Sequence, residues 1–202
     1  MSSAPGTVTT TGSGAAAGVP DSLRLDLAVR CSGQSVSAAL ARTASGVAVL
    51  VEVAHRFTDR ERVGSRALQV YPDHDREGRM VGYVAEHRVL VHCDSLDAGG
   101  QLVSALGDEV GDVLVVQSVR PVVADPAPLR VEARAAAVAD ARAVATELAG
   151  LAGRSLGEVL TVAEGGAPGP GGFAEPAALR ATSFEPGTED VTATVTVTWA
   201  LV

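Results

Sequence analysis

The sequence predicts an α+β fold in which helices pack on antiparallel sheet, because strand and helix periodicities both recur along the chain. Residues 22–31 and 190–202 alternate strictly between apolar and polar side chains, as half-buried strands do. Residues 126–152 repeat apolar side chains at helical spacing. The order helix, strand, connection, strand occurs at 34–93 and again at 126–202. We therefore expect two helix-strand-strand pseudo-repeats in one antiparallel sheet system.

Composition is typical of a folded chain, since 47% of the 202 residues are hydrophobic and 20% are charged. A chain of this length buries enough surface to fold without a metal or a disulfide. We expect a flexible N-terminus over residues 1–6 and a single domain over 7–202. Within that domain, the Gly/Pro-rich residues 165–187 predict a flexible loop.

The first half of the chain predicts strands on either side of one helix. Thr7–Thr11 fits a short edge strand, and the Gly/Ala run Gly12–Gly18 after it is expected to be a flexible break between strands. Residues 22–31 form a strand, and Ser35 then caps a helix that ends near His55. Strands at 62–71 and 80–93 follow, joined by a polar hairpin loop.

The second half predicts two helices and three strands. A short helix spans 96–106, with Asp94 or Ser95 as its cap and Gly107 as its stop. Residues 113–119 are apolar on both faces, which favours a central strand or an interface strand. Strands at 156–163 and 190–202 close the chain. The long helix at 126–152 lies between them and residues 113–119, and Gly153 ends it. Its expected buried stripe consists of Val131, Ala135, Val138, Ala145, Leu148 and Ala152.

Charge and hydropathy exclude several classes of partner. The net charge is -8 and the 16 basic residues, all Arg, are scattered, so the chain lacks the basic footprint of a nucleic-acid binder. No window approaches the roughly 18 apolar residues of a membrane span. The N-terminus lacks a secretory signal, which predicts a cytoplasmic protein as written, or an exported one if the native N-terminus was trimmed. Cys31 and Cys93 fall on apolar strand phases and are expected to be buried thiols.

Motifs with catalytic or metal-binding chemistry are weak. Gly153-Arg-Ser155-Leu-Gly157 matches a nucleophile elbow, but a helix precedes Ser155 and a strand follows it, the reverse of the required order. Asp73–Gly78 imitates the first half of a calcium loop, yet the bidentate Glu is replaced by Val84. The histidines show no metal-ligand spacing. We therefore predict no catalytic residues, no metal and no cofactor, and no enzyme activity.

Residues 115–202 resemble the SIMPL domain family in the order and spacing of their segments. The similar segments are 129–143, 149–160, 164–168 and 191–199. Residues 7–110 also resemble the family, through Thr11-Gly-Ser-Gly14, Val70-Tyr-Pro72 and Gly82-Tyr83. The resemblance implies an α+β fold and large ring-like or channel-like homo-oligomers, with a link to stress tolerance in some members. It implies no catalytic residues.

These observations predict a self-assembling structural or binding protein that forms a ring, a channel or a shell with itself as partner. The candidate interface residues are Val113, Val115, Val116, Thr192, Thr194, Thr196 and Thr198. They lie on the two-faced apolar strand and on the final strand, which is expected to have a free edge. Two alternatives stay open: a ligand carrier or enzyme whose site forms between subunits, and an adaptor that binds a partner through residues 165–187.

Overall fold

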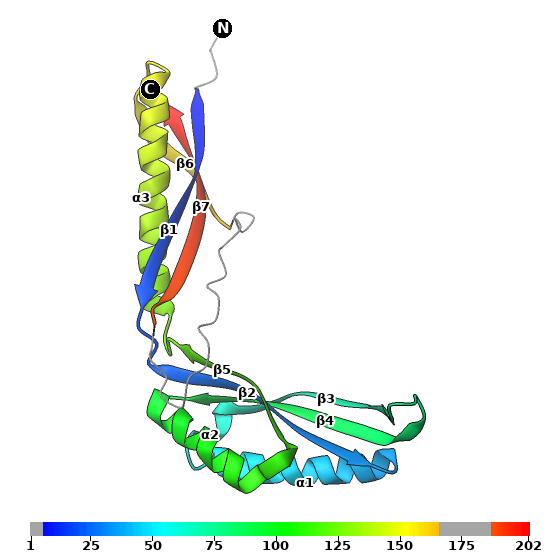
Figure 1. Cartoon of the computed structure of the whole chain (residues 1–202). Helices are drawn as coiled ribbons and strands as arrows, with labels where there is room; N and C mark the ends of the chain where they lie inside the picture. The colour runs from blue at the N-terminus through cyan, green and yellow to red at the C-terminus, as the bar shows by residue number, and fades with distance from the viewer. Residues whose placement is uncertain (1–5, 166–186) are drawn as a thin grey trace. The chain divides into compact units, whose positions relative to one another are not determined.

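The computed structural model describes residues 6–165 and 187–202, which divide into two compact units. One, here the terminal unit, contains the described residues of 6–19, 125–165 and 188–202. The other, here the central unit, comprises residues 20–124 and the described Gly187. The sequence predicts one domain with one sheet system, whereas the described residues form two separate sheets, one in each unit (Figure 1). The predicted flexible segments fall almost entirely outside the described residues.

The terminal unit is a three-stranded antiparallel sheet with one helix packed on it. Its elements are β1 (Thr7–Gly18), α3 (Ala127–Leu151), β6 (Leu156–Glu164) and β7 (Glu189–Leu201). The strand order is β1-β7-β6, and α3 packs mainly on β1 and β7. Its buried cluster is small and consists of Ala137, Ala141, Ala145, Val195, Val197 and Trp199.

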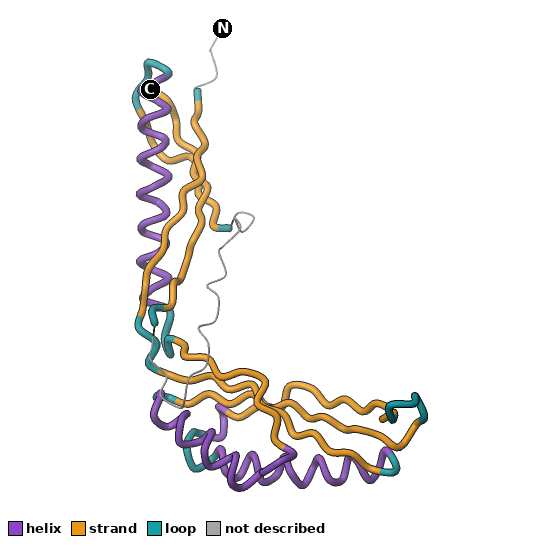
Figure 2. The backbone as a smooth tube through the Cα atoms, viewed as in Figure 1, coloured by secondary structure: helices purple, strands orange, loops and turns teal. Residues whose placement is uncertain are grey.

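The central unit is a four-stranded antiparallel sheet with two helices on one face (Figure 2). Its elements are β2 (Ser22–Gly33), α1 (Val36–Ala54), β3 (Val63–His74), β4 (Met80–Cys93), α2 (Leu96–Val110) and β5 (Leu114–Val122). The strand order is β3-β4-β2-β5. Its core joins the alternating leucines of β2 to α1, α2 and β4.

The two pseudo-repeats are confirmed, and they share a topology. In each one, the strand before the helix pairs with the last strand, and the last strand pairs with the strand that follows the helix. This pattern relates β2-α1-β3-β4 to β1-α3-β6-β7. The second set is interrupted in sequence, because the whole central unit lies between β1 and α3.

Helix starts follow the local sequence, and one helix end does not. Ser35 Oγ accepts a hydrogen bond from the N–H of Ala38 at 3.2 Å, so the predicted cap of α1 is confirmed. Ser95 caps α2 in the same way, at 3.1 Å from the N–H of Ala98. The predicted stop at Gly107 is wrong: α2 continues to Val110, and Gly111 ends it with a φ of 67°. Gly107 has no positive φ, whereas Gly111 has one, and a positive φ is a conformation that glycine adopts readily.

The Gly/Ala run after Thr11 is part of strand β1 and not a flexible break between strands. The reason is that α3 packs closely against it. A Cβ on Gly12 would lie 2.2 Å from the carbonyl oxygen of Ala137, and one on Gly14 would lie 2.2 Å from that of Ala133. No other residue type fits at such distances. The two glycines therefore allow the backbones of β1 and α3 to touch.

The predicted buried stripe of α3 is wrong except at Ala145. The buried residues are Ala133, Ala137, Ala141, Ala145 and Ala149, spaced by four. In contrast, Val131 is 63% exposed, and Val138 and Leu148 are also exposed. A helix packed against glycines has room only for methyl groups, so the larger side chains are left on the surface.

Helix α1 is apolar around most of its circumference. By length and composition alone it is the one described helix that could cross a membrane, with a mean hydropathy of 1.5, and 22% of that window is buried. It packs on β2 and β4 through one face, which includes Leu50 and Val53. The absence of a membrane span therefore stays a prediction.

Both cysteines are buried free thiols, as predicted. They lie on neighbouring strands, but the cross-strand partner of Cys93 is Leu23 and that of Cys31 is Ala85. Eight residues along β2 thus separate them, about 26 Å at the rise of a strand, which is too far for a disulfide.

Cys93 is expected to resist thiol reagents in the folded protein. Burial, with a smaller effect of Asp94, raises the pKa of its thiol to about 11. Because the folded-state pKa is raised, the unfolding free energy should fall as pH rises from about 9 to about 11, where only the unfolded thiol ionises. Denaturant unfolding across that range measures this loss, and Cys93→Ala should remove it. Rapid labelling of Cys93 in native protein at pH 8 would contradict the assignment.

Candidate functional site

Strand β6 is an exposed edge with apolar side chains on it. Among the described residues it pairs with β7 alone, on one side, and seven of its nine residues are exposed. Val162 is 61% exposed and Val159 is 53% exposed, with Leu160 exposed between them. Helix α3 lies over β1 and β7, so little of it covers β6. An unpaired strand edge bordered by apolar side chains is a template for pairing with another chain.

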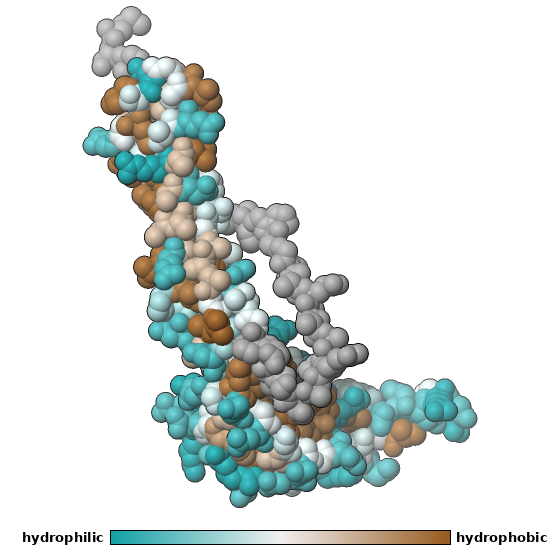
Figure 3. Space-filling view, turned by 60° about the vertical axis from the view of Figure 1, so that its left-hand side comes forward, coloured by the Kyte–Doolittle hydropathy of each residue, from teal (hydrophilic) through white to brown (hydrophobic). Residues whose placement is uncertain are grey.

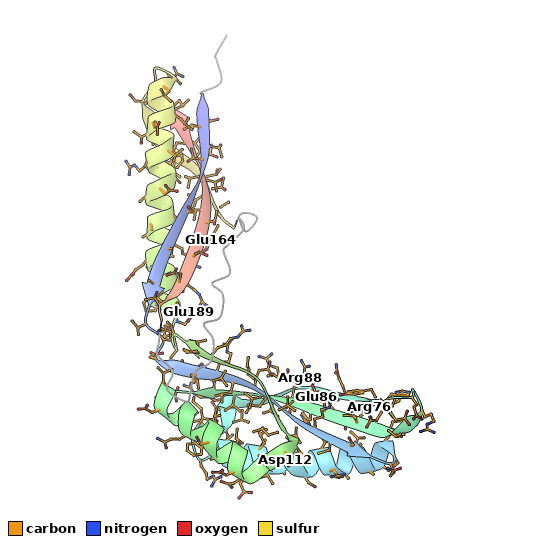
Figure 4. All side chains as sticks on the ribbon, viewed as in Figure 1. Arg76, Glu86, Arg88, Asp112, Glu164 and Glu189 are labelled. Atoms are coloured by element: carbon orange, nitrogen blue, oxygen red, sulfur yellow. The ribbon has the colours of Figure 1, made fainter. Side chains whose placement is uncertain are left out.

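Helix α3 contacts β6 near both ends of the strand, through Leu156, which packs on the alanine cluster, and through an ion pair at Glu164. Arg134 Nε donates to Glu164 Oε1 at 2.6 Å, and Figure 4 labels Glu164 at this end of β6. A small pocket of about 220 Å³ lies beside this ion pair, lined by Arg130, Arg134, Glu164, Val191, Thr192 and Ala193. Both partners of the ion pair are about half exposed, so it contributes little to stability.

The opposite edge of the same sheet is partly blocked. Asp140 Oδ2, on α3, accepts a hydrogen bond from the N–H of Ser13 at 2.9 Å. Thr10 Oγ1 donates to the carbonyl oxygen of Ala141 at 2.7 Å. Helix α3 therefore occupies hydrogen-bonding groups of β1, and β6 is the more open of the two edges.

The threonine row lies on the central strand and not at an edge. Because β7 pairs with both β1 and β6, the expectation of a free edge over residues 190–202 is wrong. Thr192, Thr194, Thr196 and Thr198 alternate with the buried Val195, Val197 and Trp199, so they lie on the face away from α3. The hydroxyl oxygens of Thr198 and Thr9 are 2.9 Å apart, and those of Thr196 and Thr11 are 3.0 Å apart. A role for this row at an interface stays a prediction.

Residues 113–119 form the edge of the central sheet. Val113 belongs to a short 3-10 helix (Gly111–Val113). Within the part of the chain that the structure describes, β5 pairs only with β2 and is an edge strand, so the central-strand alternative is wrong. Val115 is half-buried, while Val116 is 45% exposed, beside a bulge opposite Asp26 and Leu27. The edge position leaves the interface alternative open, and Val116 is its most accessible candidate.

A groove of about 570 Å³ runs along α1 in the central unit. It is lined by Ala44, Val47, Ala48, Val51, Glu52, His55, Arg60 and His87. His87 Nε2 lies 2.9 Å from Ser65 Oγ. The groove is shallow and open to solvent, and its lining combines an apolar wall with a few polar groups.

His92 and Ser22 form a polar contact that lacks the properties of a catalytic pair. Ser22 Oγ lies 3.3 Å from His92 Nε2 but donates to the carbonyl oxygen of Val122 at 2.8 Å. Ser22 is also fully buried. A nucleophile needs an accessible oxygen and a proton directed at its base. This pair therefore ties β2 to β4 and β5 rather than activating Ser22.

The His92 ring is expected to be mostly neutral at pH 6.5, the ordinary pKa of a histidine, because its own pKa is lowered. Burial lowers its pKa, and the charges of Arg62 and Arg24 lower it further. Because the folded-state pKa is lowered, His92 should contribute stability above pH 6.5 that is lost as pH falls below it. An NMR titration of the His92 ring measures the pKa directly, and a midpoint at or above 6.5 would contradict this assignment.

The remaining motifs are structural. Asp75 Oδ1 accepts hydrogen bonds from the N–H groups of Glu77 and Arg79, both at 2.9 Å, and Oδ2 pairs with Arg79, so this carboxylate stabilises the hairpin turn. Ser155 lies between the end of α3 and the start of β6, which confirms that it is a helix-to-strand turn residue. Its backbone N–H and carbonyl group both hydrogen-bond to the backbone of Val202. Within the described ranges, no three His, Cys, Asp or Glu side chains gather as metal ligands. The proposed adaptor segment lies almost wholly outside the described residues.

The sequence patterns predicted β6 as a strand, but they did not predict that its apolar side chains are exposed. The available signal was Val159-Leu-Thr-Val162, which is apolar without strict alternation and therefore places apolar side chains on both faces. Hydrophobic patches (brown) interrupt the polar surface of the chain in Figure 3. Sixteen large hydrophobic residues are exposed among the described residues, and ten of them lie in the terminal unit. The terminal unit is nevertheless the smaller of the two units in described residues.

Comparison with known proteins identifies a family and little else. One solved structure with a detectable likeness is AtUAH in complex with (S)-hydroxyglycine, at 9% identity and a TM-score of 0.26 over 56% of this chain and 29% of that chain. A likeness this low carries no argument about function. No curated protein matches the chain. The model of the SIMPL family, described as a protein of unknown function (DUF541), matches residues 8–199. Since this match covers nearly the whole sequence, the chain belongs to the SIMPL family.

Proposed function

We propose that this protein is a non-catalytic module that self-associates, and that β6 forms the main contact between one copy and the next. The observation that carries the proposal is an open edge strand whose apolar residues Val159, Leu160 and Val162 are exposed. A second copy that pairs with this edge would satisfy its free backbone groups and cover its apolar side chains.

The small core of the terminal unit supports the same proposal. Three of its six clustered buried residues are alanines, while Val131, Val138, Leu148 and Leu151 remain exposed on α3. A three-stranded sheet with one helix buries a small fraction of its surface, so association adds proportionally more burial. Closed symmetry is the usual outcome for copies of one chain.

The solution mass tests the proposal directly. Light scattering on a size-exclusion column should give a mass that is a multiple of 20.4 kDa. The multiple should hold when the protein is diluted through the micromolar range, as expected of a specific interface. A monomer at every concentration would refute self-association.

Ligand binding in the groove along α1 is a second candidate function. The supporting observation is the combination of four apolar residues of α1 with His55, His87 and Arg60 in one groove of about 570 Å³. Such a groove suits a small molecule with an apolar body. Native mass spectrometry of the purified protein tests it, because a bound molecule adds mass that denaturation releases.

A further inference from the structure

Three basic side chains lie in a row across three adjacent strands of the central unit. Arg24 on β2 is directly opposite Arg120 on β5, and it is also directly opposite His92 on β4. Arg24 alternates with the fully buried Leu23 and Leu25, so this row lies on the sheet face away from α1 and α2. Both arginines are exposed.

Neither Arg24 nor Arg120 has an ion-pair partner within 4 Å among residues 6–165 and 187–202. Two other arginines on this face do make contacts. Arg88 pairs with Glu86 at 3.0 Å on β4, where Figure 4 labels both residues, and Arg30 lies 5.8 Å from the ring centre of Tyr71.

Asp26 is the nearest carboxylate along the strand, one step further on the same face. Its Oδ1 is buried and has no hydrogen-bond partner, and Asp26 forms no ion pair with either arginine. The charge of the Arg24 and Arg120 pair is therefore not cancelled by a contacting acid. Burial, Arg62 and Arg24 lower the pKa of His92, while Asp94 and Asp21 raise it, so two carboxylates also lie near the row without forming an ion pair with Arg24 or Arg120.

Directly opposed like charges destabilise a strand pair, so an anion bound between the two arginines would relieve their repulsion. A guanidinium presents its donors in a planar fork that matches an oxyanion, and two forks on opposed residues can hold one tetrahedral anion between them. We propose that Arg24 and Arg120 form a binding site for a phosphate-type oxyanion, either free phosphate or a phosphomonoester.

Calorimetric titration tests the site in the full chain, with chloride used to hold the ionic strength constant. Wild-type protein should bind inorganic phosphate, and Arg24→Gln and Arg120→Gln should each weaken binding by about 10-fold or more, as expected for losing one charge-assisted hydrogen bond. Phosphoserine serves as the second probe. Equal affinity for both probes supports a site for the phosphate group itself, whereas binding of phosphoserine alone supports a phosphomonoester site.

Arg76→Gln is the matched control, because Arg76 lies at the tip of the β3–β4 hairpin (Figure 4) and loses the same charge. Its phosphate affinity should stay within about two-fold of wild type, since screened charges away from the site contribute little. The midpoint of thermal unfolding in chloride should not fall for Arg24→Gln or Arg120→Gln, because each removes a like-charge contact. The proposal is overturned if wild type binds neither probe, or if Arg76→Gln weakens binding as much as the site variants do.

Discussion

The Gly12→Ala variant is expected to lose about 3 kcal/mol of unfolding free energy, because one methyl group would collide with the backbone of α3. The added Cβ would lie 2.2 Å from the carbonyl oxygen of Ala137 and 2.4 Å from the backbone nitrogen of Ala141. Backbone atoms cannot rotate away as a side chain can. The helix must therefore move off the sheet and lose contact along its alanine row.

Trp199 gives a local signal for this experiment, since it is the only Trp and it is buried beside the alanines of α3. Denaturant unfolding followed by its fluorescence reports on the terminal unit. The control is Gly150→Ala in the same helix, where nothing lies within 4 Å of the added Cβ. That variant should not lose unfolding free energy, because Ala has the better helix propensity and the position lies in the last turn of α3. A loss below about 1 kcal/mol for Gly12→Ala would mean that α3 and β1 are not locked together as described.

Replacing Val159 and Val162 together with Lys is expected to convert the assembly to monomers. Charged side chains on an edge strand oppose pairing with another strand, and Lys is the residue that natural edges use most for this purpose. Both positions are more than half exposed in the single chain, so the folded unit should tolerate the change. The measurement is the mass by light scattering at matched concentration.

Leu68→Lys with Met80→Lys is the matched control for that experiment. These residues lie in the central unit and are each 54% exposed, comparable to Val159 at 53%. The control adds the same charge and removes the same kind of surface, and it should retain the wild-type mass. If the Val159 and Val162 variant also retains that mass, β6 is not the contact, and the exposed side chains of α3 become the next candidates.

The sequence predicted the elements well where a short segment carries its own periodicity. The alternation of Leu23, Leu25 and Leu27 in β2 depends on residues a few positions apart in the sequence. The cap at Ser35 likewise depends on Ala38, three residues away. The two pseudo-repeats followed from the same local patterns. Prediction failed at β1, where Gly12 and Gly14 look like a flexible run until α3 is placed against them.

Candidate surfaces were predicted less well, because exposure depends on which element lies opposite a residue. Val131, Val138 and Leu148 have the composition of a buried stripe, yet glycines and alanines at the contact leave no room for them. The exposed surface of β6 was missed for a related reason. The apolar run in residues 156–164 does not show which strands α3 covers, and α3 packs mainly on the other two.

By itself, the sequence determined the fold class, the family and the order of helices and strands, since each of these depends on local periodicity and spacing. Only the tertiary structure decided which strands are edges and which helix faces are buried. The pairing of β1 with β7 shows why, because it joins residues nearly the whole chain apart and makes β7 a central strand. Edges and buried faces are set by such distant pairings, and no pattern within one segment records them.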